Sequence, residues 1–242
     1  MSAHNERDGF LGGWAGEFVD GAGHLEEAHL AAADPCLGAV ISRVIAVEGP
    51  RRYRASNAAS HFDALARSII YQQLSKKSAA TIYARYREAL GGSAEPGAVA
   101  MTDDGALRSA GLSAPKVKYI KGLASSVVAG YLDLDRMHER TDSEIIALLT
   151  EVPGIGVWTA QMFLMFRLRR PDVLPTHDLG IRRGLQIAHR LKKPAAPGYI
   201  LRAGARWAPY RSLACLYLWA GLDLQIDPSV LGEEIGRRGR KS

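Results

Sequence analysis

The chain has 242 residues, enough to bury a hydrophobic core without disulfide bonds, and its 31 Lys and Arg against 25 Asp and Glu give a formal net charge of +6, so its surface favours polyanions. Its two cysteines, Cys36 and Cys215, are too few for a four-cysteine iron–sulfur cluster or zinc site. No apolar run approaches 18 residues and the N-terminus lacks a signal-peptide pattern, so we expect a soluble, cytoplasmic protein without a membrane partner.

The two ends of the chain differ in composition from the rest. Residues 1–24 are rich in glycine and small residues around three aromatics spaced four apart. That spacing suits one side of a helix, but the intervening glycines weaken any helix. We therefore predict a flexible N-terminal extension. At the other end, residues 231–242 form a basic tail.

From Leu25 onward the apolar residues recur almost throughout at the spacing of helices. Breaks rich in glycine and proline divide this pattern into short segments. Alternating strand patterns bounded by hairpin turns are missing from the sequence. The pattern predicts an all-α fold.

Two adjacent glutamines, Gln72 and Gln73, end one apolar helix that carries Leu65 and Ile69. Ser75 follows at the position of an N-cap for the next helix. The glutamines therefore lie in a short connection between two helices, where an ordinary exposed loop is one interpretation of them.

A helical hairpin is predicted at about residues 142–167. Thr141 and Glu144 form a capping-box pattern at its start. The apolar residues that follow recur at i, i+3, i+4 and i+7 and would form one buried stripe. Pro153 then ends the first helix, because its ring clashes with the preceding turn.

The turn of this hairpin contains Gly154 and Gly156, and a second helix runs from about Val157 to Arg167. Glycine lets the chain turn through positive φ and lie close to another backbone. Amides at the start of a helix bind anions such as phosphate. A plain connection between two helices is the alternative interpretation of the two glycines alone.

Asp178 follows one helix later, directly before an amphipathic segment that carries Ile181 and Leu185. Aspartate is among the best N-cap residues, so a structural cap is one interpretation. An ionised carboxylate beside a phosphate-binding turn is the other, because it can stabilise a developing positive charge. His177, next to it, is interpreted as a turn or surface residue.

Three separated blocks together resemble the helix-hairpin-helix DNA glycosylases, and within them the 3-methyladenine DNA glycosylase II branch in a short form. The blocks are residues 69–75, residues 152–160 with 178–181, and residues 206–212 continuing to 216–219. The resemblance covers about residues 25–225. It implies an enzyme that flips alkylated purines out of duplex DNA and hydrolyses their N-glycosidic bond, which starts base excision repair.

The resemblance assigns catalysis to Asp178, whose carboxylate would stabilise positive charge on the sugar and orient or deprotonate the attacking water. Related enzymes that also cut the strand carry a nucleophilic lysine at the position that Trp158 occupies here. Without that lysine, the resemblance implies a monofunctional hydrolase that leaves the abasic site uncut.

The same resemblance implies a base pocket formed by Trp158, Trp219 and Met162. Indole rings stack on a cationic, alkylated purine and favour it over a neutral base. Both tryptophans could instead be core residues. Met162 replaces the aromatic residue of the longer bacterial members, which implies a softer pocket wall and leaves the range of lesions open.

For DNA contacts, the resemblance places an intercalating side chain at Gln73, with Gln72 beside it, to fill the gap left by the flipped base. Gly154, Gly156 and the Thr159 region would bind the phosphate backbone through amides and a hydroxyl. Basic candidates for the electrostatic contact are Lys76, Lys77, Lys116, Lys118, Lys121, Arg182 and Arg183.

No cofactor is required by the resemblance, and an iron–sulfur cluster is not expected. Relatives hold a monovalent cation with main-chain carbonyls of the hairpin, which correspond here to Thr150, Val152 and Ile155. Any residue carries a carbonyl, so the side chains do not reveal this site.

We expect two helical lobes, one formed by residues 25–65 with 191–230 and a central one formed by residues 66–190, with the active site in the cleft between them. The partner would be double-stranded DNA with damaged bases, bound by a monomer. Two alternatives stay open: a glycosylase for oxidised or mismatched bases, and a non-catalytic hairpin protein that only binds DNA.

Overall fold

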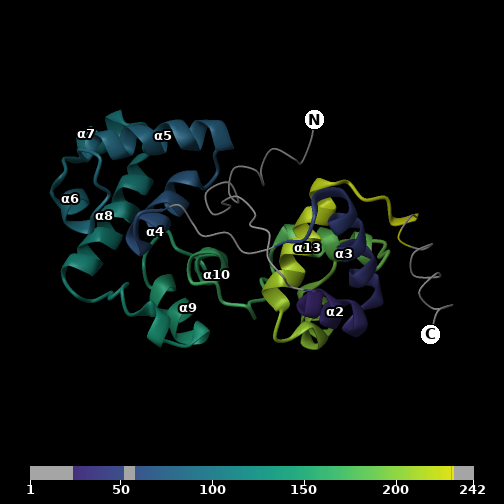
Figure 1. The fold of residues 1–242 in the computed structure, drawn as a ribbon. Coiled ribbons are helices and arrows are strands. Elements are labelled where there is room, and N and C mark those ends of the chain that lie inside the picture. The colour runs from purple at the N-terminus through teal and green to yellow at the C-terminus, as the bar shows by residue number, and fades with distance from the viewer. Residues whose placement is uncertain (1–23, 52–57, 230, 232–242) are drawn as a thin grey trace. The chain divides into compact units, whose positions relative to one another are not determined.

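The computed structural model describes residues 24–51, 58–229 and 231, and every regular element in these ranges is a helix (Figure 1). The expected all-α fold is therefore confirmed. Apart from residues 24 and 231, the predicted extension 1–24 and basic tail 231–242 lie outside the described residues. Among the helices of the described ranges, none is long and apolar enough to cross a membrane.

The described residues divide into two compact units, one formed by residues 58–168 and the other by residues 24–51 with 169–229 and 231. This division differs from the predicted lobes at both boundaries. The segment around His61 belongs to the first unit, because the helix that begins there packs on helices of that unit. Residues 169–190, which include Asp178, belong to the second unit, because the helix after Asp178 packs on three helices of that unit.

The first unit contains the helical hairpin. Its helices are α4 (His61–Tyr71), α5 (Lys76–Ala89), α6 (Pro96–Met101), α7 (Asp104–Ser109), α8 (Ala114–Val128), α9 (Asp142–Thr150) and α10 (Val157–Met162), with a 3-10 turn at Met137–Glu139. Helix α8 packs against α4, α6 and α7 and buries Ile120 and Leu123 completely. It therefore forms the main support of the unit.

The second unit is built around one fully buried helix. Its helices are α2 (His24–Ala33), α3 (Pro35–Glu48), α11 (Leu179–Ala188), α12 (Pro197–Gly204) and α13 (Arg211–Asp223), with a 3-10 turn at Ala205–Trp207. Every residue of α13 from Ser212 to Gly221 is buried, as expected of a helix covered on all sides. Helices α3 and α11 both pack against it.

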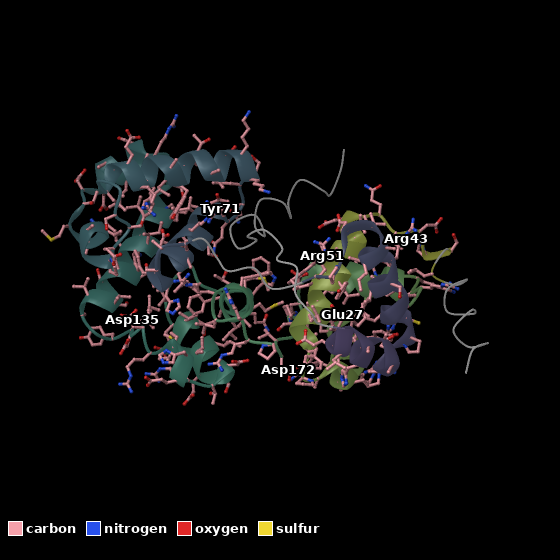
Figure 2. The ribbon with its side chains drawn as sticks, viewed as in Figure 1. Glu27, Arg43, Arg51, Tyr71, Asp135 and Asp172 are labelled. Atoms are coloured by element: carbon pink, nitrogen blue, oxygen red, sulfur yellow. The ribbon has the colours of Figure 1, made fainter. Side chains whose placement is uncertain are left out.

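A tyrosine of α13 ties the N-terminal part of this unit to its centre. The Tyr217 hydroxyl donates to Oε1 of Glu27 at 2.7 Å and accepts from the main-chain N–H of Arg51 at 3.0 Å. Glu27 lies on α2 and Arg51 follows α3, as Figure 2 shows. One buried hydroxyl thus satisfies groups from two distant segments, and buried polar groups are costly unless they are paired in this way.

Candidate active site and DNA-binding hairpin

The first helix of the hairpin, α9, begins with the predicted capping box. Thr141 Oγ1 accepts from the N–H of Glu144 at 3.3 Å, and a carboxylate oxygen of Glu144 accepts from the N–H of Thr141 at 2.7 Å. The Thr141 hydroxyl, at 2.7 Å, and the Thr141 N–H both donate to this carboxylate and hold the pKa of Glu144 below its usual value. Ile145 and Leu149 are fully buried, so the expected apolar stripe is present. The helix ends at Thr150, before Pro153.

The two glycines of the turn have different roles. Gly154 adopts φ +91°, and a Cβ placed on it would lie 2.5 Å from the Tyr119 ring. Gly156 has an extended φ of −92°, and a Cβ there would have no neighbour within 4 Å. The fold itself therefore requires glycine at position 154. At position 156 glycine leaves space above the main chain that a large external group can approach.

The second helix of the hairpin changes its geometry halfway. Helix α10 ends at Met162, and a π-helical turn continues over Phe163–Arg167, closed by the bond from Leu168 N–H to Phe163 O at 3.1 Å. We expected one regular helix to Arg167. A π turn inserts one extra residue into the helix and often occurs near functional sites.

Side chains on α10 are placed partly against expectation. Trp158 is half-buried, whereas Met162 has no exposed surface and packs in the core. Met162 could therefore influence a bound base only indirectly. Thr159 is also buried, which argues against the expected contact of its hydroxyl with a phosphate. Val157 is 53% exposed beside the open Gly156.

The connection after α4 separates the roles of the two glutamines. The Gln72 side-chain amide donates to the carbonyl of Gly154 at 2.9 Å, so it is used within the first unit. The Gln73 side chain is exposed, and its main chain adopts φ +59°, in the left-handed region that residues other than glycine seldom occupy. Of the two predicted plug residues, Gln73 alone is presented to solvent.

Three of the predicted phosphate-binding side chains are occupied inside the protein. Lys116 donates to the carbonyls of Ile70 and Gln72. Lys121 donates to Thr102 O and to the carboxylate of Asp104, and Arg182 Nε donates to Ala195 O at 2.9 Å. These bonds hold the three side chains in place without using all of their donors, so their contact with phosphate stays a prediction. Exposed members of the predicted set are Lys76, Lys77 and Lys118.

Asp178 is the N-cap of α11, and a single oxygen of its carboxylate receives two hydrogen bonds. Oδ1 accepts from the N–H of Ile181 at 2.8 Å and from the indole Nε1–H of Trp219 at 2.9 Å. The structural cap left open by the sequence is therefore present. The second bond comes from another helix and fixes the carboxylate in a way that capping alone does not require.

Close packing of α11 on α13 places this indole. A Cβ on Gly180 would lie 2.5 Å from Cδ1 and Nε1 of Trp219 and 2.8 Å from Oδ1 of Asp178. One turn later, a Cβ on Gly184 would lie 2.8 Å from the Leu218 carbonyl. Neither glycine has positive φ, so the requirement is for space. The two glycines let the helices approach until Trp219 reaches Asp178.

Trp219 was expected to be a wall of a base pocket. Its side chain is 6% exposed, and its indole N–H contacts Asp178. Nearby, burial raises the pKa of the Cys215 thiol well above its usual value, and the negative charge of Asp178 raises it further. The thiol therefore stays protonated at neutral pH.

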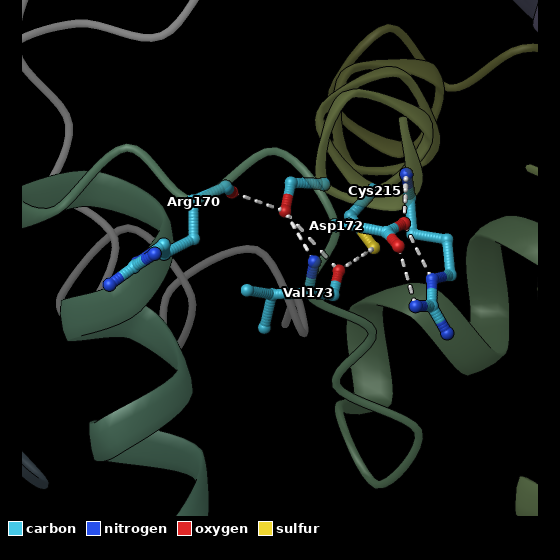
Figure 3. Close-up of polar contacts among 6 residues, drawn as sticks. Arg170, Asp172, Val173 and Cys215 are labelled. Carbon is cyan, nitrogen blue, oxygen red and sulfur yellow. Dashed lines mark hydrogen bonds and ion pairs between the residues drawn. The ribbon is translucent and has the colours of Figure 1, made fainter. Parts of the chain in front are cut away.

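The segment that leads toward Asp178 is fastened to the start of α13 (Figure 3). The Arg211 guanidinium donates to both carboxylate oxygens of Asp172 at 2.6 Å and holds the pKa of Asp172 below its usual value. Ser212 Oγ accepts from the N–H of Val173 at 2.8 Å and donates to the carbonyl of Arg170 at 2.8 Å. Asp172, Val173 and Arg170 all lie about forty residues before their partners on α13, so the local sequence pattern did not predict this attachment.

One group of potential metal ligands occurs in the described part of the chain, formed by Asp34, Cys36 and His189. Asp34 Oδ2 accepts from Trp207 Nε1 at 3.1 Å, lies 3.0 Å from His189 Nε2 and 3.6 Å from the Arg206 guanidinium. Its other oxygen caps α3. With these donors and a cation already around the carboxylate, the group is a structural network that joins α3, α11 and the Trp207 turn.

Comparison with known proteins identifies relatives of this chain. The model of the HhH-GPD superfamily base excision DNA repair protein matches residues 66–209. The DNA-3-methyladenine glycosylase 1 of Schizosaccharomyces pombe is 35% identical over 161 residues, which are 65% of this chain and 71% of that protein.

Two solved structures share both fold and sequence with the chain. The DNA-3-methyladenine glycosidase of Bacillus halodurans superimposes with a TM-score of 0.76 at 33% identity, covering 91% of this chain and 98% of that one. The S. pombe 3-methyladenine DNA glycosylase in complex with abasic DNA gives a TM-score of 0.67 at 32% identity, covering 80% and 94%. The chain belongs to the HhH-GPD superfamily of base excision DNA repair proteins.

Proposed function

We propose that this protein is a monofunctional DNA glycosylase that removes alkylated purines from duplex DNA and so starts base excision repair. The carrying observation is the Asp178 carboxylate, to which the resemblance assigns catalysis and which Ile181 and Trp219 hold in place. Support for the substrate class comes from relatives named for 3-methyladenine, at 33–35% identity.

The reaction needs little more than an oriented carboxylate and a water molecule. An alkylated purine carries a positive charge, so it departs as a neutral base with the electron pair of the bond to C1′. Positive charge then develops on the sugar, where the Asp178 carboxylate stabilises it. Water adds its oxygen to C1′ and loses a proton, for which the same carboxylate is the nearest base in this proposal.

The proposed enzyme leaves the DNA strand intact. Strand cleavage in related enzymes begins with attack of a lysine amine on the sugar, and Trp158 stands at that position. An indole has no amine to form a Schiff base. Trp158 is half-buried at the start of α10, and we propose that its exposed part stacks on the damaged base.

We propose that duplex DNA with a damaged base is bound by a monomer in the cytoplasm, with the phosphate backbone at the turn around Gly156. Support comes from the open space at Gly156 and from the DNA complex of the S. pombe neighbour. The exposed Lys76 and Lys77, which begin α5 directly after the Gln73 connection, add positive charge on the same unit.

A monovalent cation, as held by relatives, is compatible with the residues of the hairpin. Thr150 is the last residue of α9, Val152 and Ile155 follow in the turn, and the last turn of α9 holds no basic side chain. Carbonyls at a helix C-terminus carry partial negative charge and suit a cation. We propose that these three carbonyls would hold it, and its charge would favour a nearby phosphate.

The experiment is release of bases from duplex DNA methylated at purines, followed by chromatography of the free bases. We expect free 3-methyladenine, together with strands that break only after alkaline treatment. Release with strand breaks before alkali would contradict the monofunctional assignment. Tight DNA binding without release would favour a non-catalytic binding protein, and release of oxidised bases alone would move the protein to another lesion class.

A further inference from the structure

The Lys116 side chain donates hydrogen bonds to the protein's own main chain. Its ammonium donates to the carbonyl of Ile70 at 2.7 Å and to that of Gln72 at 2.6 Å. These carbonyls lie at the C-terminal end of α4, where helical carbonyls lack intrahelical partners. Partial burial lowers the pKa of Lys116, in keeping with an ammonium withdrawn from water. The side chain therefore acts as a cap delivered from α8.

The same end of α4 is joined to the turn of the hairpin. Gln72 donates its side-chain amide to the carbonyl of Gly154 at 2.9 Å, across 82 residues of sequence. Gly154 also packs against the Tyr119 ring. Tyr119 and Lys116 are three residues apart on α8, so they lie on neighbouring positions of one helix face. Helix α8 thus contacts both the end of α4 and the turn of the hairpin.

Gln73 is the next residue after this junction. Its φ of +59° is unfavourable for a residue with a Cβ, and such conformations persist where surrounding contacts impose them. The neighbouring contacts here are three hydrogen bonds. Lys116 donates to the Gln72 carbonyl, and the Gln72 side chain donates to the Gly154 carbonyl. The N–H of Leu74 donates to the carbonyl of Tyr71. The exposed Gln73 side chain is therefore presented from a constrained main chain.

We propose that Lys116 and Gln72 form a brace that locks the Gln73 connection to the hairpin turn, and that Lys116 is a positioning residue for base flipping instead of a phosphate contact. This inference rests on the proposed function, in which Gln73 fills the gap left by the flipped base. The brace joins the Gln73 plug and the hairpin turn into one rigid element. Binding of the DNA backbone at the turn therefore sets the position of the plug.

The test compares Lys116→Met with Arg108→Met in the full-length protein. Arg108 is exposed, lies on α7 in the same unit outside the predicted DNA contacts, and loses the same charge on substitution. Flipping is read from the fluorescence of 2-aminopurine placed beside an abasic-site analogue, at saturating protein. Binding is measured as a function of salt concentration. Thermal melting shows whether each variant is folded.

We expect Lys116→Met to lower the flipping signal of the saturated complex severalfold and leave the salt slope unchanged. Arg108→Met should keep both full flipping and the wild-type salt slope. Gln72→Leu should reproduce the flipping defect, and the double variant should lose little more than either single variant, because both belong to one unit. Lys116→Arg, which keeps donors for the carbonyls, should restore part of the signal.

A Lys116→Met protein with full flipping and a salt slope lowered by about one would overturn the brace and identify a phosphate contact. If Lys116→Met does not fold, full flipping by Gln72→Leu overturns it equally. Wild-type base release is measured in parallel. Its absence would contradict the glycosylase proposal alone, since the flipping assay needs no bond cleavage.

Discussion

The indole N–H of Trp219 donates to Oδ1 of Asp178 at 2.9 Å, and Gly180 of α11 lies directly against this indole. A base-stacking role was the expectation for Trp219 from the sequence. In the structure its indole N–H contacts the carboxylate, so Trp219 orients Asp178. Substitutions can therefore distinguish whether Trp219 orients the Asp178 carboxylate or stacks on the damaged base.

Trp219→Phe should keep the aromatic volume and remove the donor. We expect the single-turnover rate of base release to fall about tenfold, with little change in DNA affinity, because a hydrogen bond to a charged group contributes about 1.5–3 kcal/mol. The measurement is single-turnover release from a methylated duplex at saturating enzyme.

The matched control for this substitution uses Asp178→Asn as background. If Trp219 acts through the carboxylate, adding Trp219→Phe to Asp178→Asn should cost little beyond the single change. An equal tenfold loss in both backgrounds would show that Trp219 acts independently, for example by stacking on the base.

Gly180→Ala should damage the same contact without touching a polar group. The new methyl would meet the Trp219 ring at 2.5 Å, so the helices must separate. We expect a loss of about 1–3 kcal/mol in unfolding free energy, together with lower base release. Chemical denaturation and the release assay measure the two effects.

Gly198→Ala is the control for a helical glycine in the same unit, because a Cβ there would meet only the tip of Arg202 at 3.8 Å. It should be neutral or slightly stabilising. A Gly180→Ala protein as stable and active as Gly198→Ala would show that the close approach is not needed.

The two glycines of the hairpin turn should give opposite results. Gly156→Ala should leave the melting temperature nearly unchanged and weaken DNA binding, because the new methyl enters open space that the DNA phosphate backbone would occupy. Gly154→Ala should lower the melting temperature, because Gly154 has φ +91° and contacts Tyr119. Melting and DNA-binding titrations distinguish them. Unchanged binding by Gly156→Ala would move the phosphate contact elsewhere.

The hairpin could be predicted because its signals are local. The capping box of Thr141 and Glu144 and the stop at Pro153 concern residues within one or two turns, and the structure confirms both. The cap at Asp178 is local as well. Elements of this kind depend on neighbours in the sequence, whose identities can be read directly.

Other features depend on distant partners and could not be predicted. Lys116 looked like one more surface lysine, because its carbonyl acceptors lie about 45 residues earlier and any residue offers a carbonyl. Asp34 meets His189 and Trp207 more than 150 residues away. The predicted boundary between the two units differs from the observed one for a related reason. The helix after Asp178 has an apolar face, and the sequence pattern alone does not say which unit it packs against.

Asp34 should make the stability of the protein depend on acid pH. Burial, the largest influence, raises its pKa, but the hydrogen bond and charge of His189 and the donors of Leu37 and Trp207 outweigh it, and the net pKa is lowered from 3.8. A lowered pKa contributes stability that is present above pH 3.8 and is lost as the pH falls further through the folded-state value.

Asp34→Asn should therefore be less stable than wild type near pH 7, by about 1–3 kcal/mol, with a difference that shrinks below pH 3.8. Denaturant unfolding of both proteins from pH 7 to pH 3 measures this convergence. A constant difference across that range would contradict the assignment of the charge on Asp34.

The most direct measurement of the central claim is single-turnover release of 3-methyladenine from duplex DNA by wild type and by Asp178→Asn, with DNA binding measured in parallel. Asparagine keeps an oxygen for the bonds from Ile181 and Trp219 but carries no charge. We predict release by wild type, and a loss of at least a hundredfold in the variant with binding retained. Undiminished release by Asp178→Asn would contradict catalysis by this carboxylate.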